Sequence, residues 1–249
     1  MAAPSPRIGL TGWSLLIARA MLMLVLMLFC LPFYYLWRLL GLRRFWPRLF
    51  LSGIGRIAGI KLSIRGTPSR NALYLSNHVS WLDIPAIATA SGSAFVAHDG
   101  LAANPILRWL CQMNDTVFVA RYRRSSVSGQ AEAIRFALDD VGAITLFPEG
   151  TTGDGESLLP FKSALLSAIE PLPEGVAVQP VLLLYREAHR IAWLGDEPGL
   201  DNFKRIVGSL RPVQVTAWFL EPLSGEALHN RKAMAAVAWT AIAERLQET

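Results

Sequence analysis

Residues 72–89 read ALYLSNHVSWLDIPAIAT, and this stretch decides the fold that we expect. Ala72–Ser76 is a short apolar run, which predicts a buried strand. Leu82–Thr89 has apolar residues at helical spacing and predicts a helix. The two segments are joined by a short loop around His78. A strand that passes through a loop into a helix is the unit from which α/β sheets are built.

The same alternation continues on both sides of this stretch. Strands are expected over Lys61–Arg65, Ala72–Ser76, Ala94–Ala97, Thr116–Arg121, Ala143–Phe147, Val176–Tyr185 and Gln214–Leu220, and helices over Leu82–Thr89, Pro105–Gln112, Gln130–Asp139 and Ser163–Glu170. Met234, Val237 and Ala241 mark a C-terminal helix with Ser224 as its expected cap, and Gly150–Ser157 and Gly195–Asn202 are expected loops. The pattern predicts an α/β fold: a mixed, largely parallel sheet covered by helices.

The composition is apolar and basic. Of the 249 residues 52% are hydrophobic and 17% charged, the mean hydropathy is +0.34, and the net charge is +5. A basic balance fits nucleic acid, anionic lipid or an anionic substrate. The apolar N-terminus favours lipid, so we expect no nucleic-acid partner. The 2 cysteines lack the spacing of metal ligands, and the sequence gives no oligomeric state.

The N-terminal segment predicts a membrane anchor. No charged residue occurs from Ala20 to Trp37, and Arg19 is the one interruption if the run is extended back to Trp13. A spanning helix needs about 20 apolar residues. Aromatic residues and then arginines follow the run, which by the positive-inside tendency places the main domain on the cytoplasmic face, at the inner membrane in a bacterium. We therefore divide the chain into an anchor, residues 1–48, and a main domain, residues 49–249.

The form of this anchor is left open by the sequence. Pro32 lies inside the run and would kink or end a helix. A single span and a kinked pair of helices in one leaflet are equally compatible with the pattern. A cleaved secretory signal is a third interpretation, but bulky aromatics and arginines stand where small residues should mark a cleavage site.

His78 and Asp83 could form a catalytic pair. A neutral imidazole can take a proton from a hydroxyl that attacks a carbonyl, and a carboxylate on its other nitrogen fixes the tautomer. Asp83 is expected in the first helical turn, from which it could fold back toward His78. The alternative is a structural histidine, with Asp83 placed only to complement the helix dipole.

The segment FPEGTT, residues 147–152, is a second candidate site. Gly150 permits a positive φ, and successive amides in such a turn can hold an anion. The alternative is an ordinary turn with Glu149 in solvent. A phosphate-binding Walker A loop is excluded because Glu156 stands where that motif needs lysine. Arg121 ends an expected strand and could bind a phosphate, and Lys162 is a weaker candidate of the same kind. The alternative is a solvated basic turn, which fits the neighbouring Arg123 and Arg124 better than Arg121.

The two runs, NHVSWLD at 77–83 and FPEGTT at 147–152, resemble the glycerolipid acyltransferase family of the lysophosphatidate acyltransferase type, which carries an H-x4-D motif. Phe118–Arg121 resembles the second block of that family, which ends in a substrate-binding arginine. Val178–Val181 resembles the fourth block, and Phe161-Lys162 stands where the family often has this pair.

The resemblance implies direct acyl transfer in phospholipid biosynthesis. His78, oriented by Asp83, would deprotonate the free hydroxyl of 1-acyl-glycerol-3-phosphate, which attacks acyl-CoA or acyl-carrier protein to give phosphatidic acid. Backbone amides near Gly150 would hold the oxyanion. Substrate binding would fall to Arg121, Glu149, Gly150, Thr151, Thr152 and Lys162. The chemistry needs no metal and no cofactor beyond the acyl donor.

Three alternatives to this function remain. The family often has a lysine where Ala97-His98-Asp99 stands here, which opens the acceptor to another lysolipid such as lyso-ornithine lipid. A non-catalytic membrane module could bind lipid or acyl thioester without turnover. A secreted hydrolase is the third, but the chain has neither a G-x-S-x-G elbow nor an H-E-x-x-H zinc motif.

Overall fold

The computed structural model describes residues 9–41, 45–98, 105–119, 138 and 140–249. Its central feature is a seven-stranded sheet in the order β1-β7-β6-β2-β5-β3-β4. The strands are β1 (Ile60–Arg65), β2 (Ala72–Ser76), β3 (Ala94–His98), β4 (Val117–Val119), β5 (Ala143–Leu146), β6 (Ala177–Tyr185) and β7 (Val213–Phe219). Every neighbouring pair is parallel except β6 and β7. The expected mixed, largely parallel sheet is confirmed.

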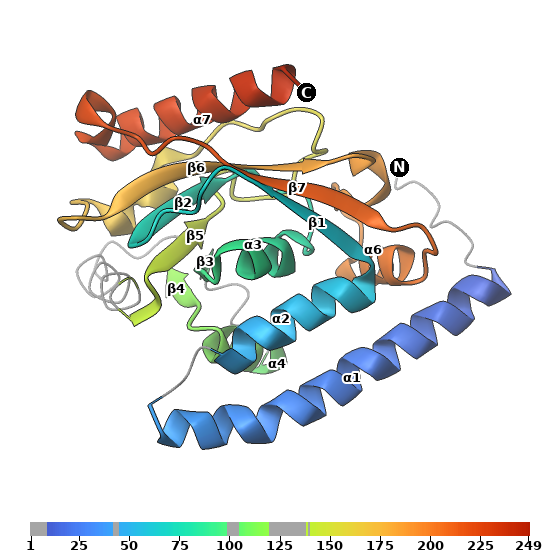
Figure 1. Ribbon diagram of the computed structural model, residues 1–249. Coiled ribbons are helices and arrows are strands. Elements are labelled where there is room, and N and C mark those ends of the chain that lie inside the picture. The colour runs from blue at the N-terminus through green and yellow to red at the C-terminus, as the bar shows by residue number, and fades with distance from the viewer. Residues whose placement is uncertain (1–8, 42–44, 99–104, 120–137, 139) are drawn as a thin grey trace.

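Helices cover both faces of the sheet (Figure 1). The described helices are α1 (Leu10–Leu39), α2 (Phe45–Ala58), α3 (Asp83–Ser91), α4 (Pro105–Met113), α6 (Gly199–Val207) and α7 (Arg231–Gln247), with 3₁₀ turns η3 (Ser163–Ile169), η4 (Ala188–Arg190) and η5 (Gly225–Leu228). In Figure 1, α7 lies on one side of the sheet, and α1, α2, α3 and α6 lie on the other.

The core explains why the central strands are apolar along their whole length. Ala72 and Tyr74 of β2 face the cluster beneath α3, whereas Leu73 and Leu75 face the cluster beneath α7. All four side chains are at most 1% exposed. A strand buried on both faces cannot alternate apolar and polar residues, so a continuous apolar run is the expected signal of a parallel sheet.

Several boundaries differ from those expected. The segment Gly195–Asn202 is not all loop, because α6 begins at Gly199 with Asp201 in its first turn. Helix α2 was not expected at all. The segment Ser163–Glu170 forms a 3₁₀ helix over Ser163–Ile169 and not the expected α-helix. The last two residues of the expected strand Thr116–Arg121 lie outside the described residues. So does the expected helix Gln130–Asp139, except for residue 138.

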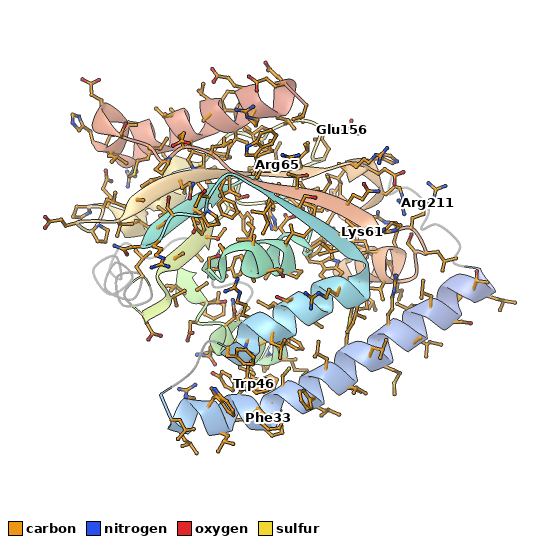
Figure 2. The ribbon with its side chains drawn as sticks, in the orientation of Figure 1. Phe33, Trp46, Lys61, Arg65, Glu156 and Arg211 are labelled. Carbon is orange, nitrogen blue, oxygen red and sulfur yellow. The ribbon has the colours of Figure 1, made fainter. Side chains whose placement is uncertain are left out.

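Helix α1 continues through Pro32 as one helix of 30 residues, so Pro32 does not end the helix. By length and composition it could cross a membrane. One stripe of it, Leu16, Met23, Cys30 and Tyr34, is buried against the rest of the protein. The Phe33 ring stacks on Trp46 of α2 with centroids 4.9 Å apart (Figure 2). Helix α2 thus joins α1 to the domain, and residue 48 lies inside it.

Asn230, and not Ser224, caps the C-terminal helix. Its side-chain oxygen accepts hydrogen bonds from the amides of Lys232 and Ala233, both at 3.0 Å. Ser224 precedes η5 and makes no capping bond. The Ser224 prediction was wrong because a short 3₁₀ turn separates this serine from the helix.

Replacing Asn230 by alanine should lower the free energy of unfolding by about 1 kcal/mol, because two amides at the helix start lose their acceptor. Urea unfolding of the purified protein in detergent, followed by circular dichroism, measures this change. The matched control is Ser224→Ala, for which we expect a change below about 0.5 kcal/mol. Equal losses of unfolding free energy in the two variants would contradict the assignment of Asn230 as the cap of α7.

Candidate active site

The two sequence blocks meet at one edge of the sheet. His78 follows the end of β2, Glu149 follows β5, and Tyr185 ends β6. These three strands are adjacent and parallel, so their carboxyl ends lie at the same edge. This is where open α/β sheets place their ligands. The contact between the blocks is direct, since the amide of Gly153 donates to the carbonyl of His78 at 2.7 Å.

His78 and Asp83 form the expected pair. The Nδ1 atom of His78 lies 2.7 Å from Oδ2 of Asp83. The side chain of His78 is 22% exposed and that of Asp83 is fully buried. The imidazole also stacks on the ring of Phe147, with centroids 4.1 Å apart. The imidazole is therefore held on one edge and one face while part of it remains accessible to solvent.

The Asp83 carboxylate accepts hydrogen bonds on both oxygens. In addition to His78, Oδ2 receives the amides of Val79 at 2.6 Å and Ser80 at 3.0 Å. Oδ1 receives the hydroxyl of Tyr185 at 2.6 Å. A buried carboxylate needs such partners to remain charged. Asp83 also opens α3, so it lies in the first turn as expected.

Asn77 fixes the start of the histidine loop. Its amide nitrogen donates to the carbonyl of Leu183 at 3.0 Å, and its amide oxygen accepts from the Leu183 backbone at 2.7 Å. The side chain thereby extends the pairing of β2 with β6 beyond the last strand residue. Asn77 and Tyr185 were not among the predicted site residues, although Asn77 stood inside the quoted motif.

The FPEGTT segment forms a tight turn. Gly150 has φ +68°, a conformation that favours glycine, and its amide donates to the carbonyl of Phe147 at 3.1 Å. Its amide thus closes the turn in this structure. Lys162 lies beside the turn, donates its own amide to Pro148 at 2.8 Å, and has an exposed side chain. Thr151 is exposed at the tip.

Glu149 is buried, which contradicts the alternative of a solvated turn residue. It is 2% exposed, and its Oε2 has no hydrogen-bond partner among the described residues. The pKa of its carboxyl is raised to about 8, chiefly by burial and in smaller part by the charges of Asp83 and Asp154. A hydrogen bond from the His78 backbone and the charge of Lys162 act in the opposite direction.

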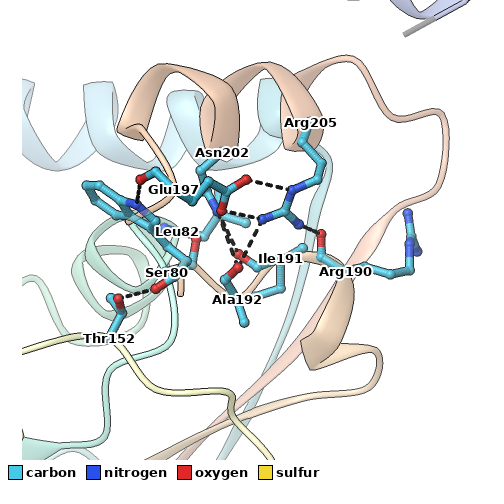
Figure 3. Close-up of polar contacts among 10 residues, drawn as sticks. Ser80, Leu82, Thr152, Arg190, Ile191, Ala192, Glu197, Asn202 and Arg205 are labelled. Carbon is cyan, nitrogen blue, oxygen red and sulfur yellow. Dashed lines mark hydrogen bonds and ion pairs between the residues drawn. The ribbon is translucent and has the colours of Figure 1, made fainter. Parts of the chain in front are cut away.

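A third segment, unrecognised in the sequence, joins the two blocks. The Trp193 amide donates to the carbonyl of Val79 at 3.0 Å, and the Trp193 carbonyl accepts from the hydroxyl of Thr152. Arg205 holds this segment in place by donating to the Ala192 carbonyl at 3.0 Å and pairing with Glu197 at 2.8 Å (Figure 3). The Thr152 hydroxyl thus helps to hold the second block against the Trp193 segment.

The remaining predicted residue, Arg121, lies outside the described residues. Within the described ranges, no group of three or more His, Cys, Asp or Glu side chains is placed to hold a metal ion. The site therefore offers an oriented imidazole, a buried carboxyl and a glycine turn. These groups can move a proton and bind a polar substrate.

The raised pKa of Glu149 predicts a dependence of stability on pH. The folded carboxyl binds a proton between its ordinary pKa of 4.5 and about 8, whereas the unfolded one does not. The free energy of unfolding should therefore fall as pH rises across this window, by at most about 1.4 kcal/mol per pH unit. Glu149→Gln should show a flatter profile in thermal unfolding of the detergent-solubilised protein. If the stability of the wild type and of Glu149→Gln fell equally with pH, Glu149 would not be the group whose raised pKa causes the dependence.

Comparison with known proteins places this geometry in a family. Residues 60–184 match the family model described as Acyltransferase. A lyso-ornithine lipid O-acyltransferase of Brucella abortus is 33% identical over 232 residues, which cover 86% of each chain. A 1-acyl-sn-glycerol-3-phosphate acyltransferase of Neisseria gonorrhoeae is 34% identical over 139 residues, which cover 53% of each chain.

A solved structure has the same fold. The 1-acyl-sn-glycerophosphate acyltransferase PlsC of Thermotoga maritima superposes with a TM-score of 0.65 and 20% identity. The match covers 93% of this chain and 96% of the other, so it includes the helices before the sheet as well as the sheet itself. Fold, motif blocks and sequence matches agree, and the chain belongs to the acyltransferase family as an acyl-transferring enzyme.

Proposed function

We propose that the chain transfers a fatty acyl group from a thioester to the free hydroxyl of a lysolipid. The observation that carries this proposal is the contact between His78 Nδ1 and Asp83 Oδ2 at the carboxyl edge of the sheet. Relatives matched over most of this chain are named for acyl transfer to a lysolipid. Binding of a lipid without turnover does not require an oriented, partly exposed imidazole, whereas proton transfer does.

The proposed reaction begins at His78. With its Nδ1 proton held by Asp83, its Nε2 accepts the proton of the acceptor hydroxyl as that oxygen attacks the thioester carbonyl. The tetrahedral intermediate then collapses, the carbon–sulfur bond breaks, and the imidazolium returns its proton to the thiolate. The products are an ester and a free thiol. The donor is acyl-CoA or acyl-carrier protein, and no other cofactor takes part.

Lyso-ornithine lipid is the acceptor that we propose first. The relatives that match most of this chain and most of their own length carry that name. Lysophosphatidate is the second candidate, because 1-acyl-sn-glycerol-3-phosphate acyltransferases match about half of the chain. Glu149, Thr151 and Lys162, together with Arg121, are the residues to which we assign contact with the acceptor headgroup.

We further propose that α1 lies along a membrane surface. The face opposite its buried stripe exposes large apolar side chains: Leu10, Trp13, Ile17, Met21, Leu22, Leu24, Val25, Leu28, Phe29, Tyr35, Leu36 and Leu39. The charged Arg19 points into the protein, where it donates to the carbonyls of Val207 at 3.0 Å and Ser209 at 2.8 Å. A helix attached to the domain along its length favours insertion into one leaflet over a span. The arginines after α1 support a location of the domain on the cytoplasmic face.

His78→Ala should abolish acyl transfer, and Asp83→Asn should lower kcat by at least about 10²-fold, because the base is lost or held in the wrong tautomer. The assay incubates membranes that contain each variant with labelled acyl-CoA or acyl-carrier protein and a panel of lysolipids. Ester formation on lyso-ornithine lipid and on lysophosphatidate is compared by thin-layer chromatography.

The panel also separates the acceptors and the alternative functions. If ester formed with lysophosphatidate alone, lyso-ornithine lipid would be rejected as the acceptor, but the proposed mechanism would stand. Turnover that survives in His78→Ala would remove this imidazole from the reaction. Binding of lipid without turnover in the wild type would favour the non-catalytic module.

Aspartate at both Leu22 and Val25 should release the protein from membranes, because each side chain is more than half exposed on the outer face of α1. Flotation with vesicles of phosphatidylethanolamine and phosphatidylglycerol measures the bound fraction. The matched control is Val237→Asp on α7, which lies on the far side of the sheet (Figure 1). If the double variant bound vesicles as fully as the wild type, the proposal that α1 inserts into one leaflet would be wrong.

A further inference from the structure

A buried tyrosine lies behind the catalytic pair. Tyr185 is the last residue of β6 and is 4% exposed. Its hydroxyl donates to Oδ1 of Asp83 at 2.6 Å, while Oδ2 of the same carboxylate contacts His78 at 2.7 Å. The three side chains therefore form one hydrogen-bonded line from the interior of the sheet to its accessible edge.

We propose that Tyr185 is a positioning residue of acyl transfer, which holds Oδ1 of Asp83 so that Oδ2 stays aimed at Nδ1 of His78. This inference rests on the proposed function of the His78–Asp83 pair. The terminal torsion of an aspartate is soft, so its plane is set by its hydrogen bonds and not by a rotamer well. The amides of Val79 and Ser80 hold only Oδ2, so among the described residues Tyr185 is the group that fixes the other oxygen.

Tyr185 can act only as a donor at working pH. Burial, and next the negative charge of Asp83, raise the pKa of its phenol well above the ordinary value. The neutral hydroxyl gives its proton to the carboxylate and draws charge away from it. Without this bond the carboxylate would attract the His78 imidazolium more strongly, so the acid limb of the pH–rate profile should move to higher pH.

Other titratable groups face the pair in the described part of the chain. Glu149 contributes from the loop after β5, with Asp154 and Lys162 beyond it. None of them bonds to Tyr185, so removal of its hydroxyl leaves their own contacts in place. Glu149 ionises near pH 8, so it affects the alkaline part of the pH–rate profile. The shift that we propose for Tyr185→Phe concerns the acid limb.

The neighbouring strand provides a matched control. Tyr74 of β2 is 1% exposed, and its hydroxyl donates to the backbone carbonyl of Ser69 at 2.6 Å. Its ring packs against Phe219, with centroids 5.3 Å apart. Tyr74→Phe and Tyr185→Phe each delete one buried hydroxyl from a central strand. Only the second deletion removes a bond to the His78–Asp83 pair.

The experiment measures kcat and KM for acceptor and donor across pH for wild type, Tyr185→Phe, Tyr74→Phe and His78→Ala, all as full-length protein in membranes. Tyr185→Phe should lower kcat by about tenfold or more, which is part of the about 10²–10⁴-fold that a positioned base supplies. Both KM values should stay within about twofold, because substrate contacts are unchanged. The acid limb of kcat/KM should move up by about half a pH unit or more, and Tyr74→Phe should leave it in place.

A second variant covers the case in which Tyr185→Phe folds poorly. Fluorotyrosine placed at position 185 keeps the ring and makes the hydroxyl a stronger donor, so the acid limb should move to lower pH. An unmoved limb in the folded variants, or equal effects of Tyr185→Phe and Tyr74→Phe, would overturn the inference. Turnover retained by His78→Ala would instead overturn the proposed function, which keeps the two failures distinguishable.

Discussion

The site depends on one buried carboxylate whose charge must be compensated. Asp83 is fully buried and accepts from His78, Val79 and Ser80 on one oxygen and from Tyr185 on the other. Burial of an unpaired charge would cost several kcal/mol. The histidine loop, the start of α3 and the end of β6 are therefore arranged around this group, and the position of the imidazole follows from that arrangement.

The rest of the framework holds the two motif loops against each other. Gly153 bonds to His78 directly, and Trp193 bridges Val79 and Thr152 through its backbone. Arg205 fixes the bridging segment from α6. The bonds from Gly153 to His78 and from Trp193 to Val79 join backbone atoms alone, so these two do not depend on which side chains occupy the loops. Such a framework leaves the loop side chains free to differ in acceptor preference while the imidazole keeps its place.

Helix α1 carries two kinds of apolar surface. One stripe of α1 packs on α2 and the domain, and the opposite face remains exposed. Arg19 interrupts the apolar run in the sequence, yet its guanidinium is satisfied by backbone carbonyls at the end of α6 and not by lipid headgroups. Arg48 likewise donates to the carbonyl of Thr89 at 3.2 Å. Positive charge near an apolar helix is thus not always available to a membrane.

The sequence by itself determined the mixed, largely parallel sheet, and it gave the pairing of His78 with Asp83 as one of two alternatives. Buried strands and first-turn carboxylates leave local patterns, and β2 was predicted to the residue. It did not reveal Tyr185, the burial of Glu149, the Trp193 bridge or the true cap Asn230. The first three arise from residues far apart in the chain, and the fourth from a 3₁₀ turn that no periodicity marked. Only the tertiary structure decided them, because hydrogen bonds between distant strands and loops leave no periodic trace in a single sequence.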